Sequence, residues 1–176
     1  GAAGVANQAW LDSLIDDGFH TRLLEAAEMC SALGGVYLRI VWDTAVSDIP
    51  WIQPIPADVA VPAFSYDKLA SVTFWRVLSD DGNDVIRHLE MHVPQANQII
   101  HGVYQGDQSD LGEIIPLASF PATSSLASDL QGDPLTLPDL PFDASTVVYI
   151  PNLRPNKIWR ALGPQAWPLG RSDYQG

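Results

Sequence analysis

The chain has 176 residues, enough for one domain with a sizeable core, and an apolar fraction of 47% that is typical of a globular protein. Its net charge of −12 opposes nucleic-acid binding by phosphate neutralisation and docking on anionic membranes. Fourteen prolines and thirteen glycines favour loops and short strands over a helical bundle. No apolar run reaches the ~18 residues of a membrane span, and the only cysteine, Cys30, excludes an intramolecular disulfide.

The N-terminal part predicts helix. Apolar residues recur at helical spacing over residues 7–33, with an interruption expected at Gly18. Asn7 or Asp17 is expected as an N-cap, because a side-chain oxygen there accepts hydrogen bonds from free backbone N–H groups. Gly34 should end the helix, because glycine tolerates the left-handed conformation of a C-terminal cap.

Two segments after the helix predict strands. Residues 36–42 are almost continuously apolar, which is typical of a buried strand. Residues 51–62 contain Pro54, Pro56 and Pro62, and this spacing permits short edge strands but excludes a central one, because proline donates no ladder hydrogen bond.

Three consecutive strands are predicted over residues 70–79, 84–93 and 98–105, and we expect the fold to be organised around them. The break at 80–83 reads Asp-Asp-Gly-Asn, which suits a tight hairpin, and the break at 94–97 begins with proline and ends with asparagine. Connections this short predict antiparallel pairing, hence a β-meander. Both faces of the meander carry large apolar residues, so the second face should be partly covered, by this chain or by another.

The remaining residues predict a loop-rich C-terminal part. A short strand is expected over 113–117, a short helix from Pro121 to Leu130, a surface connection over 131–143 and a strand over 146–150. We therefore expect an α+β fold, with N-terminal helices packed on a mainly antiparallel sheet built around the meander. The expected organisation is a single domain, residues 1–176, with a helical part (1–34), a β-rich core (35–118) and a loop-rich segment with a short helix and one strand (119–176).

A row of polar residues is the candidate metal site. His88, Glu90 and His92 alternate along one predicted strand, and His101 lies on the next. Two histidines and a carboxylate are reasonable ligands for zinc or iron. Side chains two residues apart on a strand lie ~7 Å from each other, however, which is too far to converge on one small ion without bending. We expect instead a polar row on a wet or inter-subunit sheet face, with no metal and no cofactor.

Signatures of other catalytic chemistry are weak. The C-terminal sequence around Ser172 loosely resembles a Gly-x-Ser-x-Gly nucleophile elbow, but the second glycine is misplaced and no strand is predicted before it. The paired carboxylates at 16–17 and 80–81 fall in predicted caps or turns, and no phosphate-cradling glycine loop is present in the sequence. We expect that the protein is not an enzyme.

The C-terminal part also carries a basic zone on an otherwise acidic chain. No acidic residue occurs over residues 144–172, and Arg154, Lys157 and Arg160 are spaced three apart with Trp159 beside them. Two interpretations stay open: a solvated basic face, or a contact surface for an acidic partner, for which a neighbouring copy of this chain would qualify.

Several segments together resemble the portal proteins of tailed bacteriophages, most closely the type carried by phages and prophages of actinobacteria. They are residues 34–39 (Gly-Gly-Val-Tyr-Leu-Arg), 74–78 (Phe-Trp-Arg-Val-Leu), 87–92 (Arg-His-Leu-Glu-Met-His) and 100–106 (Ile-His-Gly-Val-Tyr-Gln-Gly). Residues 151–160 and 169–174 are similar to the most recognisable sequence of that group, and the resemblance spans nearly the whole chain. These two segments hold the candidate subunit-contact residues Arg154, Pro155, Asn156, Lys157, Trp159, Arg160, Gly170, Arg171, Ser172, Asp173 and Tyr174.

The resemblance implies a non-enzymatic subunit of a closed ring, usually of about twelve copies, at one vertex of the capsid. Double-stranded DNA passes through the channel of such a ring, driven by a separate terminase motor. The implied partners are copies of the chain, capsid and terminase proteins, and passing DNA without specific binding. The implied location is the virion, and the host cytoplasm during assembly.

Of the wing, stem, clip and crown of a portal subunit, the chain resembles the wing alone, and we expect it to be a piece of a longer protein. Two alternatives stay open. One is a small metal-dependent enzyme that uses His88, Glu90, His92 and His101. The other is a protein-interaction domain that docks through the basic aromatic segment at residues 154–160.

Overall fold

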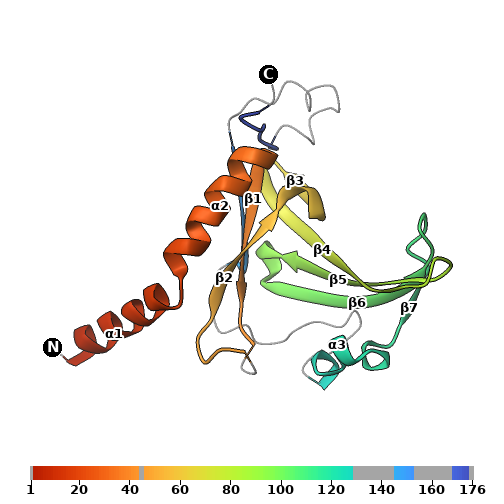
Figure 1. The fold of residues 1–176 in the computed structure, drawn as a ribbon, viewed down its shortest axis with the longest axis horizontal. Helices are drawn as coiled ribbons and strands as arrows, with labels where there is room; N and C mark the ends of the chain where they lie inside the picture. The colour runs from red at the N-terminus through yellow and green to blue at the C-terminus, as the bar shows by residue number, and fades with distance from the viewer. Residues whose placement is uncertain (1, 44–45, 129–144, 153–167, 175–176) are drawn as a thin grey trace. The chain divides into compact units, whose positions relative to one another are not determined.

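A computed structural model describes residues 2–43, 46–128, 145–152 and 168–174. It confirms an α+β fold with helices packed on antiparallel sheets (Figure 1). The chain forms two compact units: the first comprises Gly1–Asp58 and Val147–Gly176, and the second comprises Val59–Thr146. These boundaries differ from the subdivisions expected after residues 34 and 118. Each unit is described by itself.

The first unit begins with two helices separated by a glycine. Helix α1 spans Ala2–Asp16 and helix α2 spans Phe19–Leu33. Gly18 lies between them with a φ of 87°, so the predicted interruption is confirmed. Gly34 caps the end of α2 with a φ of 84°, and its N–H donates to the Cys30 carbonyl at 3.0 Å, as expected.

The two expected N-caps are wrong. Helix α1 already begins at Ala2, so Asn7 lies inside it. Gly18, not Asp17, is the N-cap of α2, because its left-handed backbone supplies the break, and no side chain caps the helix. The carboxylate of Asp17 instead accepts a 2.8 Å hydrogen bond from the guanidinium of Arg22.

A three-stranded antiparallel sheet completes the first unit in the order β2-β1-β8. Its strands are β1 (Gly35–Val41), β2 (Trp51–Pro56) and β8 (Val147–Pro151). Helix α2 packs against β1 and β2 (Figure 1), and β2 is an edge strand, as its prolines predict. The buried apolar residues of this unit include Ala26, Val36, Tyr37, Ile55 and Val147.

The second unit is built on a five-stranded antiparallel sheet in the order β3-β4-β5-β6-β7. The strands are β3 (Ala60–Ser65), β4 (Lys68–Asp80), β5 (Val85–Val93), β6 (Gln98–Gly106) and β7 (Glu113–Ile115). Strands β4, β5 and β6 are the predicted meander, within two residues at each end. The turns use the expected chemistry: Gly82 has a φ of 90° and Asn97 a φ of 50°.

Three short helical turns follow β7: η3 (Leu117–Ser119), α3 (Pro121–Ser124) and η4 (Leu126–Ser128). We call residues 117–128 the helical cover. Its Leu117 forms a buried cluster with Val103 of β6, and other apolar residues of the cover and the sheet pack around these two. The predicted helix from Pro121 is therefore shorter than expected and continues as a 3-10 turn; Leu130 and the connection over 131–143 lie outside the described residues.

The ladder registers assign each residue of the five-stranded sheet to one of two faces. On one face, three rows of neighbouring residues cross β4, β5 and β6 in that order. They are Val72, His92 and Ile99; Phe74, Glu90 and His101; and Arg76, His88 and Val103. We call this the covered face, because Val103 packs against the helical cover. The outer face carries Val61, Thr73, Trp75, Val77, Leu89, Met91, Ile100, Tyr104 and Ile114.

Candidate functional site

The polar row of the meander lies on the covered face, and the expectation of a wet face is wrong. His88, His92 and His101 are 4%, 1% and 8% exposed, which makes them part of the interior of the second unit. They share their face with apolar residues such as Phe74 and Val103. Alternation along the strands correctly groups the row on one face, but it cannot say which face is covered when both faces carry large apolar residues.

His88 and His101 are joined ring to ring. The Nε2 atom of His88 lies 3.1 Å from the Nδ1 atom of His101, their ring planes differ by 8°, and their centroids are 5.3 Å apart. This centroid separation is close to the largest that a 3.1 Å nitrogen–nitrogen distance permits, so the two nitrogens lie on the line between the ring centres. The rings are therefore nearly coplanar and edge to edge, joined by one N–H···N hydrogen bond in which one ring donates and the other accepts. We call these two residues the histidine pair.

His92 is held at both ring nitrogens. Its Nε2 lies 2.6 Å from Oε1 of Glu90, and its Nδ1 lies 2.7 Å from Oγ1 of Thr146. Because an ionised carboxylate only accepts hydrogen bonds, Nε2 donates to Glu90, and in the neutral ring Nδ1 accepts from the Thr146 hydroxyl. The ring of Phe74 meets His92 edge-on at 5.5 Å and closes its apolar side.

The order hydroxyl, imidazole, carboxylate is also that of a hydrolase triad. A nucleophile must reach substrate, however, and Thr146 is 5% exposed. Sequence reasoning missed Thr146, which comes 54 residues after His92 and carries no local motif. Its role in this arrangement is to satisfy a buried imidazole nitrogen, since a buried polar atom without a partner is costly.

The geometry of the row can be compared with that of a metal centre. Among the described residues no group of three or more His, Cys, Asp or Glu side chains is placed to hold an ion. Tetrahedral zinc binds nitrogens whose lone pairs both point at the metal, off the line that joins the two nitrogens. In the histidine pair the two nitrogens, 3.1 Å apart, instead point at each other and share a hydrogen bond.

Among the described residues, Arg76 and Glu90 are charged neighbours of the histidine pair in the ladder. Arg76 of β4 lies beside His88 in the ladder, and its Nη2 donates to the Ala122 carbonyl of the helical cover at 3.3 Å. Glu90 of β5 lies beside His101 and binds His92. The described strands thus place one cation and one anion beside the pair, and residues 117–128 of the helical cover contain no ionisable side chain.

The described part of the candidate subunit-contact set folds back onto the first unit. Asp173 accepts hydrogen bonds from Ser31 at 2.5 Å and Asn152 at 2.9 Å, which lower the pKa of its carboxyl, and its N–H donates to the Ser31 carbonyl. Gly170 donates its N–H to the Tyr149 hydroxyl at 3.1 Å, and Ser172 is buried. Arg171 is half-buried and Tyr174 is exposed. Arg154, Pro155, Asn156, Lys157, Trp159 and Arg160 lie outside the described residues.

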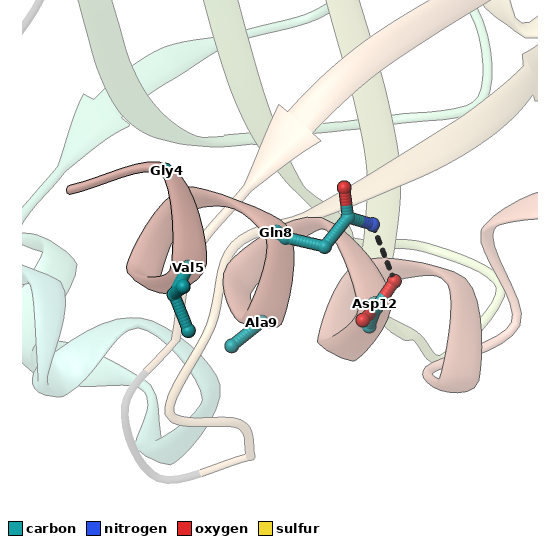
Figure 2. Close-up of a pocket in the computed structure, with 5 residues that line it drawn as sticks. All are labelled: Gly4, Val5, Gln8, Ala9 and Asp12. Carbon is teal, nitrogen blue, oxygen red and sulfur yellow. Dashed lines mark hydrogen bonds between the residues drawn. The ribbon is translucent and has the colours of Figure 1, made fainter. Parts of the chain in front are cut away.

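Two hollows lie at the surface of the described part of the first unit. Figure 2 shows one along α1, lined by Gly4, Val5, Gln8, Ala9 and Asp12, in which Gln8 donates to Asp12 at 2.8 Å. All five residues belong to a single helix, so the hollow is the side of that helix. A second hollow lies along α2 beside Tyr174. No helix among the described residues has the length and hydropathy needed to cross a membrane.

Comparisons with protein-family models, with curated proteins and with solved structures gave no significant match. The resemblance to portal proteins therefore depends on the sequence segments given above, and the function that it implies stays a prediction.

Proposed function

We propose that this chain is the wing region of a structural subunit of a phage portal ring, through which double-stranded DNA enters and leaves the capsid. In this role the chain contributes shape and contact surface, and its side chains make or break no bond. The sequence resemblance supports the proposal, and so does the distribution of apolar side chains over the surface.

The observation that carries the proposal is the outer face of the five-stranded sheet. Val61, Trp75, Val77 and Ile114 are 63%, 45%, 47% and 64% exposed on β3, β4 and β7. Single exposed apolar residues are ordinary, but large ones gathered on one face of one sheet mark a surface that another surface covers. A subunit of a ring meets this condition, because each copy is flanked by two others.

Helix α1 also exposes large apolar side chains, as the outer face of the five-stranded sheet does. Val5, Trp10, Leu11 and Ile15 are each at least 45% exposed along it. The distribution of charge favours a contact between two different surfaces of neighbouring copies. Residues 144–172 include basic residues and no acidic residue, while the chain as a whole is strongly acidic. A basic zone on one copy facing an acidic surface on the next is a head-to-tail contact of the kind that closes rings.

Light scattering and electron microscopy of the full-length gene product test the proposal. We expect a ring of many copies, and a strictly monomeric product would contradict it. Elemental analysis of the same preparation separates the alternative of a metal-dependent enzyme. Stoichiometric zinc, iron or manganese would favour that alternative, which the geometry of the histidine pair does not support.

A further inference from the structure

We propose that helix α1 of one copy of this chain packs on the outer face of the five-stranded sheet of the next copy. The inference rests on the proposed function, in which copies of the chain are neighbours in a ring, and it names what covers the outer face there. Three observations carry it: a stripe of exposed apolar side chains on α1, a sheet face with little charge, and charges of opposite sign on the two surfaces.

Most of the large apolar side chains of α1 lie on one side of the helix. We call four of them the α1 stripe: Trp10, Leu11, Leu14 and Ile15. Their spacing of i, i+1, i+4 and i+5 spans roughly 140° of the helix surface, since each residue turns the helix by about 100°. Three of the four are about half exposed, and Leu14 is partly exposed. Gln8 and Asp12, drawn in Figure 2, lie on the other side of the helix.

Contacts within the described part of the chain leave the α1 stripe exposed. Among the described helices and strands, α2 is the one that has more than a marginal contact with α1. The two helices are separated at Gly18, whose φ of 87° ends one helix and begins the next. A Cβ on Gly18 would have no atom within 4 Å, so this break is not packed against the rest of the chain. A partner can therefore reach the stripe.

The outer face is the less polar of the two faces of the five-stranded sheet. Over residues 71–77 of β4 and the residues paired with them, it carries one charged side chain, Arg87. Over the same residues the covered face carries a cation, a carboxylate and three histidines. The guanidinium of Arg87 donates to the carbonyl oxygens of Asp107 at 2.8 Å and Asp110 at 3.4 Å, in the loop between β6 and β7. The rest of this part of the face is uncharged.

A helix fits the outer face in size. Since a helix is ~10 Å wide and strands lie ~4.8 Å apart, a helix on β5 also covers the side chains of β4 and β6. The 15 residues of α1 extend ~22 Å, which is within the ~30 Å of the nine-residue strand β5. On β6 the ring of Tyr104 lies over Gly102, where a Cβ would be 2.8 Å from it, so this part of the face is flat. Packing a helix on a sheet is a stable way to bury both apolar surfaces.

The charges favour α1 over other occupants. The outer face has a cation and no carboxylate over the residues named above, while α1 has two carboxylates, Asp12 and Asp16, and no cation. The two surfaces are therefore of opposite sign. Two outer faces packed together would instead bring two copies of Arg87 into one interface. A nucleic acid would need several cations, and this face has one.

The contact is head to tail, because each copy has one α1 stripe and one outer face. A contact of this kind uses both surfaces of every copy and continues from copy to copy until a ring closes. It also buries the two half-exposed tryptophans, Trp10 of the stripe and Trp75 of the face, and tryptophan is the residue type that most often dominates the energy of an interface.

Photocrosslinking of the whole chain tests the inference. A benzoylphenylalanine probe replaces Trp10 in one variant and Gln8, on the other side of the same helix, in the control. Unlabelled chains and heavy-isotope chains are mixed in equal amounts before irradiation, and mass spectrometry identifies the joined peptides. We expect the probe at Trp10 to join α1 to peptides of β4, β5 and β6 in light–heavy pairs. Its yield should be several-fold above that of the probe at Gln8.

Trp10→Asp gives a second readout, since it places a carboxylate inside the α1 stripe. It should raise the Kd between copies by about tenfold or more, measured by sedimentation equilibrium. Gln8→Asp adds the same charge on the other side of the helix and should leave the Kd unchanged. Both side chains are exposed, so the circular dichroism of both variants should stay that of the wild type.

Joined peptides without any light–heavy pairs would show that α1 covers the sheet of its own chain, and this would overturn the inference. Equal yields from the two probes, or crosslinks that lie outside the outer face, would also overturn it. Rings that form without these crosslinks would overturn the inference and leave the proposed portal function in place. A strictly monomeric protein would contradict both the inference and the proposed function.

Discussion

The backbone of Gly170 lies against the carbonyl oxygen of Gly34, so closely that a Cβ on residue 170 would overlap that oxygen. The same Cβ would also overlap the backbone of Asn152, whose N–H donates to the Gly34 carbonyl at 3.0 Å. Three segments that are distant in the sequence, the end of α2, the end of β8 and the C-terminal segment, therefore meet at one point of the first unit without room for a side chain.

Gly170→Ala should destabilise the first unit by about 1–3 kcal/mol, because the added methyl group meets backbone atoms that cannot rotate away. Urea unfolding followed by circular dichroism measures this. Gly4→Ala is the matched control, since no atom lies within 4 Å of a Cβ there and alanine favours a helix. Equal unfolding midpoints for the two variants would contradict the close approach.

The Asp173 carboxylate predicts an acid transition in the first unit. Hydrogen bonds from Ser31 and then from Asn152 lower its pKa, so the stabilisation is present above the ordinary carboxyl value of about 4 and is lost as the pH falls below it. Asp173→Asn should lower the unfolding midpoint at neutral pH and flatten its dependence on pH below about 4. The exposed Asp48→Asn is the control, and an Asp173→Asn protein with the wild-type acid profile would contradict the prediction.

The buried phenol of Tyr37 predicts that the first unit loses folding stability at alkaline pH. Its burial, and then the neighbouring Tyr149 at a ring separation of 4.7 Å, raise the pKa of its phenol well above the usual range. The unfolded chain ionises this phenol above about pH 10 while the folded chain does not, so stability is full below that value and falls as the pH rises. The loss should reach at most about 1.4 kcal/mol per pH unit.

Tyr37→Phe should remove most of this alkaline dependence, as urea unfolding midpoints between about pH 8 and about pH 11 would show. Tyr174→Phe is the control, because Tyr174 is exposed. A Tyr37→Phe protein that is as sensitive to alkali as the wild type would mean that another group sets the limit.

The strands of the second unit were predictable because the signals are local. Hairpin residues at 80–83 and 94–97 delimit β5, and alternation within it correctly groups His88, Glu90 and His92 on one face. The break between α1 and α2 was predictable for the same reason, since Gly18 alone adopts the positive φ that divides them. The missing N-cap at Asp17 could not be foreseen, because the backbone of Gly18 takes that position.

The sequence was enough to predict which strand residues belong to the polar row, but not how they are covered, partnered and oriented. Which face of the meander is covered depends on the helical cover, whose contact with Val103 is made through residues more than ten positions later in the chain. The partner of His92 depends on Thr146, and the in-line geometry of the histidine pair depends on the register of β5 and β6. None of these has a periodicity or motif in the sequence.

Substitutions of Phe74 and Trp75, which are adjacent on β4, compare the two faces of the five-stranded sheet. Phe74 lies on the covered face, 6% exposed and against His92, so Phe74→Ala should cost about 3–5 kcal/mol of unfolding free energy. Trp75 lies on the outer face and is 45% exposed, so Trp75→Ala should cost about 1 kcal/mol or less in this chain.

In the proposed ring the ranking should change, because a half-exposed tryptophan on an apolar face is the kind of residue that carries an interface. We expect Trp75→Ala to shift light-scattering profiles from ring toward smaller species while circular dichroism stays that of the wild type. The exposed Tyr66→Ala, at the β3–β4 hairpin of the same unit, is the control and should still form rings. Rings that form equally well with and without Trp75 would show that the outer face is not the contact between copies, even if the ring itself exists.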